Sequence, residues 1–534
     1  MNGGAPAGTP TPSRVVLLGA VCAVLAGAVR LWTLRDLEAA DPLFRVTILD
    51  EAVYVREALR IHEGRPATSA SLVSMLWPWL LALFGAVTRH AASLVNVGLG
   101  SAIAGIAAAG AARLGGSLAA GAVAGGICAL SGALVFQDAT AQIETLLALS
   151  VLASVLASAA AARSPTWMRL ALAGAAAGIA ILGRGTHAGL LLGTIPALRG
   201  AGPRTGALRA LVLAIAAAAP IVAFDQAVGA VPTSAGVNVW LGNNLWSRTT
   251  RSFGTGEIAM DPDGEARDVV RVATEAEGGR PLSTAEINAW WMRRAWREMS
   301  ADWGAAFGHF AAKAALVFYV PDMGGNHDAD VERQFAAWLR VAPVSVAWIL
   351  VLGAAGWVVA RRGAPGVDAA ALAVVGGIAA LIVVFPLTRY RMPLVPAAAV
   401  LVGVGVAAVV ARRVDRGPRI AAGIVVVSLA AVAVVASSLR PAAKPEAWTN
   451  LGLAAMDTGV GDPDAYLVRA LAEDPSYPIP ALILGNRALE RGDAREAIRR
   501  FDAAAAAAGG RPRWAGIVRD AELGRAKALA LLGR

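Results

Sequence analysis

The feature that most constrains this chain is a series of apolar runs, each long enough to cross a lipid bilayer. A transmembrane helix needs about 20 consecutive, mostly apolar residues. We expect full spans at 15–32, 91–111, 117–136, 141–162, 207–228, 342–360, 367–386, 392–411 and 418–438. A further apolar stretch, 170–200, is broken at Arg184-Gly185 and predicts two shorter spans. The sequence therefore predicts an all-α polytopic membrane protein with about eleven transmembrane helices.

The composition agrees with this prediction. Hydrophobic residues make up 57% of the chain, above the roughly 45–50% of ordinary soluble domains. The formal charge of +10 comes mostly from arginines in short loops between the apolar runs, which is typical of polytopic proteins and argues against nucleic-acid binding. Cys22 and Cys128 both lie inside apolar runs and suggest neither a disulfide framework nor a metal site.

Arginine placement predicts how the chain is oriented. If the ambiguous segment 71–87 lies at the outer interface instead of crossing, five arginine-bearing loops share one side with the N-terminus. Because positive loops favour the cytoplasm, the N-terminus is then cytoplasmic. The regions 33–90, 229–341 and 441–534 face outward, and the first span is expected to stay uncleaved. This arrangement suits the inner membrane of a bacterial cell envelope.

An acidic pair, Asp50 and Glu51, follows the first span in the stretch ILDEAVYVREALRIHEG. In a structural interpretation, Asp50 caps the N-terminus of a helix and Glu51 complements the helix dipole. In a functional interpretation, the rigid helix end holds a carboxylate for chemistry near the outer membrane surface. The two interpretations are compatible.

Basic residues are expected on the same side. In TRYRMPLVP, Arg389 and Arg391 flank Tyr390 between two apolar spans. They could be snorkelling helix anchors, but paired guanidinium groups also suit phosphate. Arg184 stands at the break between the two short spans, where a charge costs up to about 2.5–3.5 kcal/mol and needs a partner or a task. An acidic group facing basic groups is what transfer from a lipid phosphate requires.

The stretch LDEAVYVREALRIHEG resembles the first-loop acidic motif of the GT-C membrane glycosyltransferases. It is most similar to the bacterial family-39 type, akin to protein O-mannosyltransferases and lipid A aminoarabinose transferases. RYRMPLVP, VWLGNNLWSRT, QDATAQIETLLAL and the long loop that carries Lys313 resemble further family stretches in the same order. The resemblance covers roughly residues 15–440. Gly185 departs from it, because the family usually has proline after the arginine that Arg184 matches.

The resemblance implies a GT-C fold and an inverting sugar transfer from a polyprenyl-phosphate donor to an acceptor hydroxyl of a protein, lipid or glycan. Asp50 would be the general base, and Glu51 would orient the acceptor or help to hold a metal. Some family members need a divalent cation and others do not, so a cation requirement stays open. The five histidines, at positions 62, 90, 187, 309 and 327, have no metal-ligand spacing and are expected to be structural or exposed.

Two further groups of residues receive roles from the resemblance. The expected donor-phosphate group comprises Arg389, Tyr390, Arg391, Arg184 and Lys313. The expected substrate group comprises Asn243, Asn244 and Glu144. Gly-Asn-Asn is equally typical of a plain turn.

The chain after the last span has a different character. AWTNLGLAAM at 447–456 and ALILGNRALE at 481–490 align with each other and resemble tetratricopeptide repeats, which need about three units for stability. We therefore expect a membrane domain at 1–440 and a soluble helical repeat domain at 441–534. The repeats could bind a protein acceptor or partner, or could be a helical hairpin without a binding role.

Two other functions compete with a glycosyltransferase. A transporter or flippase for a polyprenyl-linked sugar would bind the same phosphate, but it should carry more charges along its spans. A non-catalytic scaffold that presents the repeats would not need Asp50.

Overall fold

The computed structural model describes the chain from residue 10 to residue 533, with gaps. The described ranges are 10–66, 73–228, 234–244, 257–258, 262–342, 345–360, 364–411, 416–439, 443–511 and 514–533. Within these ranges every regular element is an α-helix or a 3-10 helix. The predicted all-α class is therefore confirmed for the part of the chain that the structure describes.

Seven described helices are long and apolar enough to cross a membrane, which makes the chain a multi-pass protein. They are α1 (Pro12–Ala40), α4 (Arg89–Gly115), α7 (Glu144–Arg163), α10 (Pro203–Val228), α18 (Pro365–Val383), α20 (Val395–Val410, continuous in the span Thr388–Val410) and α21 (Arg416–Leu439). The pair α5 (Leu118–Leu130) and α6 (Gly132–Ala139) is bent by 49° and adds an eighth. The remaining predicted spans are shorter helices: α8 (Trp167–Gly183), η2 (Gly185–Thr194) with α9 (Ile195–Leu198), and α17 (Val346–Ala360).

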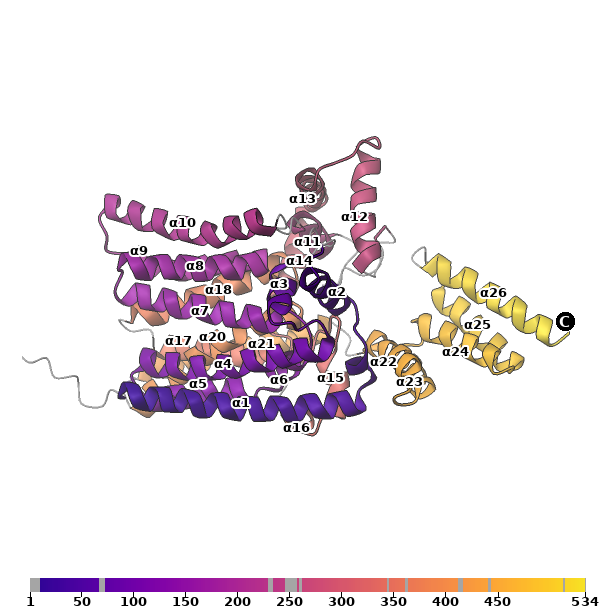
Figure 1. Cartoon of the computed structure of the whole chain (residues 1–534), viewed down its shortest axis with the longest axis horizontal. Helices are drawn as coiled ribbons and strands as arrows, with labels where there is room; N and C mark the ends of the chain where they lie inside the picture. The colour runs from indigo at the N-terminus through magenta and orange to yellow at the C-terminus, as the bar shows by residue number, and fades with distance from the viewer. Residues whose placement is uncertain are drawn as a thin grey trace, which may run out of the picture.

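These helices run side by side as one bundle (Figure 1). Small residues let their backbones approach closely. A Cβ atom built on Gly19 of α1 would lie 3.0 Å from the carbonyl oxygen of Gly105 of α4. One built on Gly189 of η2 would lie 2.1 Å from the carbonyl oxygen of Gly376 of α18. Glycine at such crossings is typical of helix packing in membranes, where van der Waals contact replaces the hydrophobic effect.

The described parts of two connecting segments, one between α1 and α4 and one between α10 and α17, gather at one end of the bundle (Figure 1). They form α2 (Asp50–His62), α3 (Leu76–Leu83), α11 (Ala235–Asn243), α12 (Pro262–Ala276), α13 (Thr284–Ala301) and α14 (Trp303–Leu316). The helix α3 is about 12 Å long, too short to cross a bilayer, as the predicted orientation requires.

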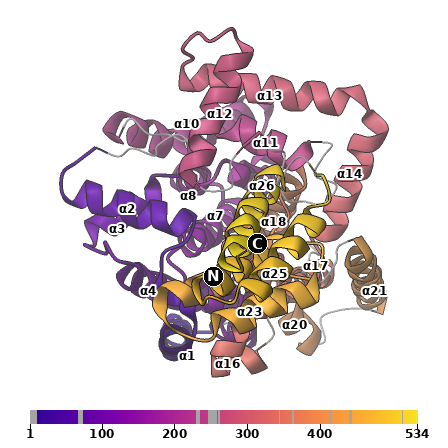
Figure 2. The ribbon, with the colours of Figure 1, turned by 90° about the vertical axis from the view of Figure 1, so that its right-hand side faces the viewer.

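The C-terminal helices stack beyond this end of the bundle (Figure 2). They are α22 (Pro445–Thr458), α23 (Pro463–Glu473), α24 (Ile479–Glu490), α25 (Ala494–Ala508) and α26 (Ala515–Leu531). We call them the repeat helices, after the repeats that the sequence predicts. Phe501 fills their core against Gly485 and Gly524. Trp448 of α22 packs with Leu43, which lies between α1 and α2, so the repeat helices dock directly on the bundle.

Candidate functional site

A cavity of about 560 Å³ lies where the ends of α8 and α18 meet α2 and the short helix α19 (Thr388–Arg391). Part of its wall is apolar and comes from three helices of the bundle, with Ile181, Ile221 and Val383 among its residues. Another part carries the polar side chains Asp50, Tyr54, Arg184, Arg389 and Tyr390. A cavity with apolar and charged parts suits an amphiphilic ligand.

The carboxylate of Asp50 is paired with Arg389 across the cavity wall. Arg389 Nη1 donates to Asp50 Oδ2 at 2.6 Å and to Asn326 Oδ1 at 3.1 Å. Asp50 is the first residue of α2, and the capping position is Leu49, with no side-chain cap. The predicted capping role of Asp50 is therefore wrong, because its carboxylate binds Arg389 instead.

The backbone immediately before Asp50 is strained. Leu49 has φ 47° and ψ −122°, and it is the sole non-glycine residue with positive φ in the described ranges. The Glu51 N–H donates to the carbonyl oxygen of Ile48 at 3.0 Å and closes a tight turn around Leu49. A bulky side chain in this conformation costs about 1–3 kcal/mol, and strain of this kind concentrates at functional sites.

The aromatic ring of Tyr390 lies close to both cavity arginines. Arg184 Cζ lies 4.1 Å from the ring centroid and Arg389 Cζ lies 5.2 Å from it. Arg184 Nη2 also donates to Glu144 Oε1 at 2.8 Å. Glu144 is buried beneath Arg184 and is not one of the residues that line the cavity. Its contact is with Arg184, where a contact with substrate was predicted.

Three donors beside the cavity have no hydrogen-bond partner among the described residues. They are Arg184 Nη1, Arg389 Nε and the hydroxyl of Thr186, and all three atoms are buried. A buried donor without a partner costs about 1–3 kcal/mol, so such groups call for an explanation. An anion bound in the cavity would provide acceptors for them.

Glu51 points away from the cavity and is fully buried. Glu51 Oε1 accepts from the Ala141 N–H at 2.8 Å and lies 3.3 Å from His327 Nε2, while Oε2 accepts from Arg89 Nε at 3.3 Å. Burial favours a higher pKa for Glu51, but Arg89 and His327 outweigh it and lower the pKa to about 2. Glu51 therefore ties α2 to the bundle, and its predicted role toward an acceptor or a metal stays a prediction.

Arg391 is also turned into the protein. Its Nη1 donates to the carbonyl oxygens of Val317 and Tyr319, both at 2.9 Å, and its Nη2 donates to Thr388 Oγ1 at 2.8 Å. The side chain is 1% exposed and does not line the cavity. This position gives no support to the prediction that Arg391 binds the donor phosphate, which stays a prediction.

Lys313, Asn243 and Asn244 form a separate cluster. Lys313 Nζ donates to Asn243 Oδ1 at 2.6 Å, and burial lowers the pKa of Lys313 to about 7. The side-chain amides of Asn243 and Asn244 donate to backbone carbonyls, including Val239 and Leu241. The asparagines line another cavity, of about 460 Å³. The predicted roles in phosphate and sugar binding are not supported here, and residues 245–249 of that loop lie outside the described ranges.

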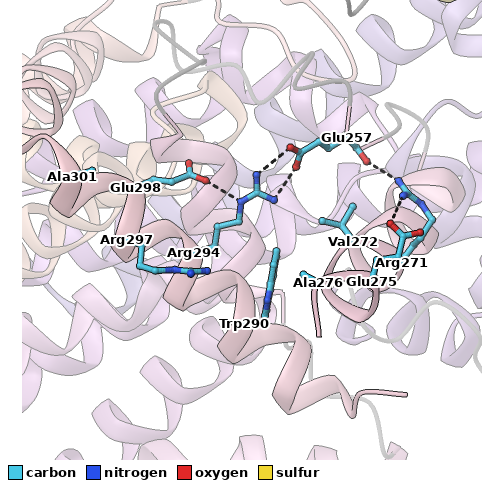
Figure 3. Close-up of a pocket in the computed structure, with 10 residues that line it drawn as sticks. All are labelled: Glu257, Arg271, Val272, Glu275, Ala276, Trp290, Arg294, Arg297, Glu298 and Ala301. Atoms are coloured by element: carbon cyan, nitrogen blue, oxygen red, sulfur yellow. Dashed lines mark hydrogen bonds and ion pairs between the residues drawn. The ribbon is translucent and has the colours of Figure 1, made fainter. Parts of the chain in front are cut away.

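A larger hollow of about 700 Å³ lies between α12 and α13 (Figure 3). Its Arg294 donates to Glu257 Oε2 at 2.8 Å and to Glu298 Oε1 at 2.9 Å, and it lies over the ring of Trp240. These charges neutralise one another, and none of the predicted site residues lines this hollow.

Three residues near the site received no role in the sequence analysis. Tyr54 follows Asp50 by one helical turn, a spacing that places it on the same face. Thr186 lies two positions after Arg184, and Asn326 lies in a segment without a recognisable pattern. Among the described residues, no group of three or more histidine, cysteine, aspartate or glutamate side chains could hold a metal ion.

Comparison with solved structures finds six similar chains. No protein-family model and no curated protein sequence matches the chain. The crystal structure of ArnT from Cupriavidus metallidurans bound to undecaprenyl phosphate is similar over 97% of this chain and 78% of ArnT, with 14% identity and a TM-score of 0.40. Because the identity and the TM-score are both low, the function proposed below rests on the geometry of the site.

Proposed function

We propose that this chain is an integral membrane glycosyltransferase that moves a sugar from a polyprenyl-phosphate donor to an acceptor hydroxyl on the outer face of the membrane. The observation that carries this proposal is the pairing of Asp50 with Arg389 in the wall of a cavity that is partly apolar and partly charged. The proposed orientation keeps the N-terminus cytoplasmic and the repeat helices outside.

The donor would lie in the cavity with its phosphate at the two arginines. The unpaired Arg184 Nη1 and Arg389 Nε supply donors for phosphate oxygens, and guanidinium groups suit that geometry. The first isoprene units would contact apolar side chains such as Ile181 and Ile221. Thr186 supplies a further hydroxyl at the same wall.

Asp50 would act as the general base. The acceptor oxygen forms a bond to the anomeric carbon and loses its proton to the Asp50 carboxylate. The bond between that carbon and the phosphate oxygen breaks, and its electron pair leaves on the phosphate. Arg184 and Arg389 would stabilise this charge as it develops. Attack opposite the leaving phosphate inverts the anomeric configuration.

In this scheme Arg389 would exchange one anionic partner, the Asp50 carboxylate, for another, the donor phosphate. In the structure it binds Asp50, whereas a bound phosphate would compete for the same guanidinium group. Arrival of the donor would then weaken the hold on the carboxylate and leave it free to accept the acceptor's proton. Donor binding and activation of the base would be coupled through one side chain.

The test is sugar transfer from a labelled polyprenyl-phosphate sugar by membranes that carry the wild-type chain or Asp50→Asn. The amide keeps the shape of the side chain but is a poor base, so we expect a loss of about 10²–10⁴-fold. The matched control is Asp263→Asn. Asp263 of α12 forms an exposed ion pair with Arg56 of α2, the helix that begins at Asp50, and such pairs contribute only about 0–1 kcal/mol. Wild-type transfer by Asp50→Asn would refute the proposed role.

A further inference from the structure

The segment 322–332 (DMGGNHDADVE) follows α14 and ends in the short helix α15 (Ala329–Glu332). We call it the clamp loop. It is unusual for a loop because most of its polar side chains are buried, including Asn326, His327, Asp328 and Glu332. Buried charged groups are retained only where they are paired, so the partners of these residues indicate what the loop holds.

One set of partners belongs to α19 and includes Arg389. The Met323 N–H donates to Thr388 Oγ1 at 2.8 Å, and the Thr388 N–H donates to the Met323 carbonyl at 3.3 Å. Asn326 Oδ1 accepts from Arg389 Nη1 at 3.1 Å. A Cβ atom on Gly325 would lie 3.1 Å from Arg389 Cδ. The clamp loop therefore lies directly against the arginine that binds Asp50.

The next residue of the loop holds the other member of the acidic pair. His327 Nε2 lies 3.3 Å from Glu51 Oε1, and His327 Nδ1 lies 2.8 Å from Glu332 Oε2. Asn326 thus contacts Arg389, the partner of Asp50, while His327 contacts Glu51, the residue that follows Asp50. Two consecutive residues of one loop therefore link α19 to the start of α2.

The loop is in turn fixed by the repeat helices. Lys444 Nζ, just before α22, binds Asp328 Oδ1 at 2.6 Å and Asp330 Oδ2 at 2.8 Å. The backbone N–H of Lys444 donates to Glu473 Oε2 of α23 at 2.6 Å. No described residue after 443 lines the 560 Å³ cavity. An influence of the repeat helices on the site would have to pass through such intermediate contacts.

We propose that the clamp loop is a positioning element that keeps the side chains of Asp50 and Arg389 aligned with each other. The ion pairs of Lys444, just before α22, would fix the clamp loop in its position. The proposal rests on the proposed transfer reaction for its effect on rate. Without the Lys444 charge, Asp328 and Asp330 would face each other without their cation, and the loop should move. Asp50 and Arg389 would then lose their alignment although neither was changed.

The test compares full-length Lys444→Met with Lys444→Arg and the control Lys527→Met, an exposed lysine of α26. Misalignment of reacting groups lowers the rate by about tenfold to a hundredfold. We expect a loss of this size in kcat/KM for Lys444→Met, with a lower kcat because Asp50 is displaced and a higher KM for the donor because Arg389 also binds the donor phosphate. We expect Lys444→Arg to recover most of the rate, because it restores the charge, and Lys527→Met to match wild type.

Backbone hydrogen exchange in the same proteins tests the clamp without activity. In Lys444→Met, amides 51–62 of α2 should exchange faster than in wild type, while those of α24 and α25 keep their protection. Unchanged exchange in α2, or faster exchange confined to the repeat helices, would overturn the proposal. If wild type shows no transfer, the proposed function fails, while the exchange experiment still decides on the clamp. If the wild type is active and Lys444→Met has the same kcat, the clamp-loop proposal is also overturned.

Discussion

The two arginines of the RYR stretch should give opposite results when each is replaced. Arg391 Nη1 and Nη2 make three short hydrogen bonds, to the carbonyls of Val317 and Tyr319 and to Thr388 Oγ1. Arg391→Met leaves these buried acceptors without that donor, and each costs about 1–3 kcal/mol. Allowing for relaxation, we expect a loss of about 3–5 kcal/mol in the free energy of unfolding and a clearly lower Tm.

Arg389→Gln should instead weaken donor binding. A hydrogen bond to a charged group contributes about 1.5–3 kcal/mol, so the Kd for polyprenyl phosphate should rise about 10–150-fold. The Tm should change less than in Arg391→Met, because Arg389 is partly exposed to the cavity and binds a half-buried carboxylate.

Both quantities can be measured on the same detergent-purified proteins. Thermal unfolding followed by tryptophan fluorescence gives the Tm, and titration with polyprenyl phosphate gives the Kd. Arg391→Lys is a useful further control, since it keeps a charge but cannot reproduce the planar arrangement of donors. If Arg391→Met weakened binding while its Tm stayed at the wild-type value, the assignment of Arg389 to the ligand and Arg391 to the fold would be refuted.

Three other predictions follow from the surroundings of α2. Leu49→Gly should raise the Tm, because glycine adopts the positive φ of this position without the strain of about 1–3 kcal/mol; a lower Tm would contradict the assignment of strain. Glu332 and Glu51 overcome the effect of burial and raise the pKa of His327 from 6.5 to about 10, so its contribution to stability is full below pH 6.5 and lost as the pH rises through about 10. His327→Gln should therefore have a lower Tm at pH 6 and a smaller decrease in Tm between pH 7 and pH 10 than wild type; equal decreases would contradict this linkage. Glu144→Gln should lower the affinity for polyprenyl phosphate by releasing Arg184 from its carboxylate, whereas unchanged affinity would show that Glu144 has no part in orienting it.

The sequence was sufficient to predict the bundle and part of the site. Apolar runs identify membrane helices because a bilayer leaves few alternatives for the backbone. Arg184 was selected because a charge near a membrane is costly, whereas the roles of Asp50 and Arg389 rested on the fit of guanidinium groups to phosphate and on the family resemblance. The structure brings the side chains of Asp50 and Arg389 to 2.6 Å although 339 positions separate them.

The sequence could not distinguish between neighbouring charges, of which the structure places one at the cavity and the other within the protein. Arg389 and Arg391 lie in one helical turn, and helical residues two positions apart point in different directions. One therefore faces the cavity and the other faces the carbonyls of residues 317 and 319. The same geometry separates Asp50 from Glu51. Which member of each pair faces the ligand depends on the helix's rotation, and this is set by packing partners far away in sequence.

Asn326 could not have been found from local pattern. It is a single amide in a loop whose burial results from contacts with α2, α19 and the repeat region, which no local pattern predicts. The role of Lys444 could not have been found from local pattern either, because its partners Asp328 and Asp330 lie more than 100 positions away, in the loop before α17.

The decisive measurement is a single-turnover experiment on purified Asp50→Asn loaded with a labelled polyprenyl-phosphate sugar. We expect the variant to bind the donor with an affinity close to wild type, since Arg184 and Arg389 are intact, and to transfer the sugar at least about 10²-fold more slowly. Equal transfer rates for Asp50→Asn and wild type, with the donor bound in both, would contradict the assignment of Asp50 as the base.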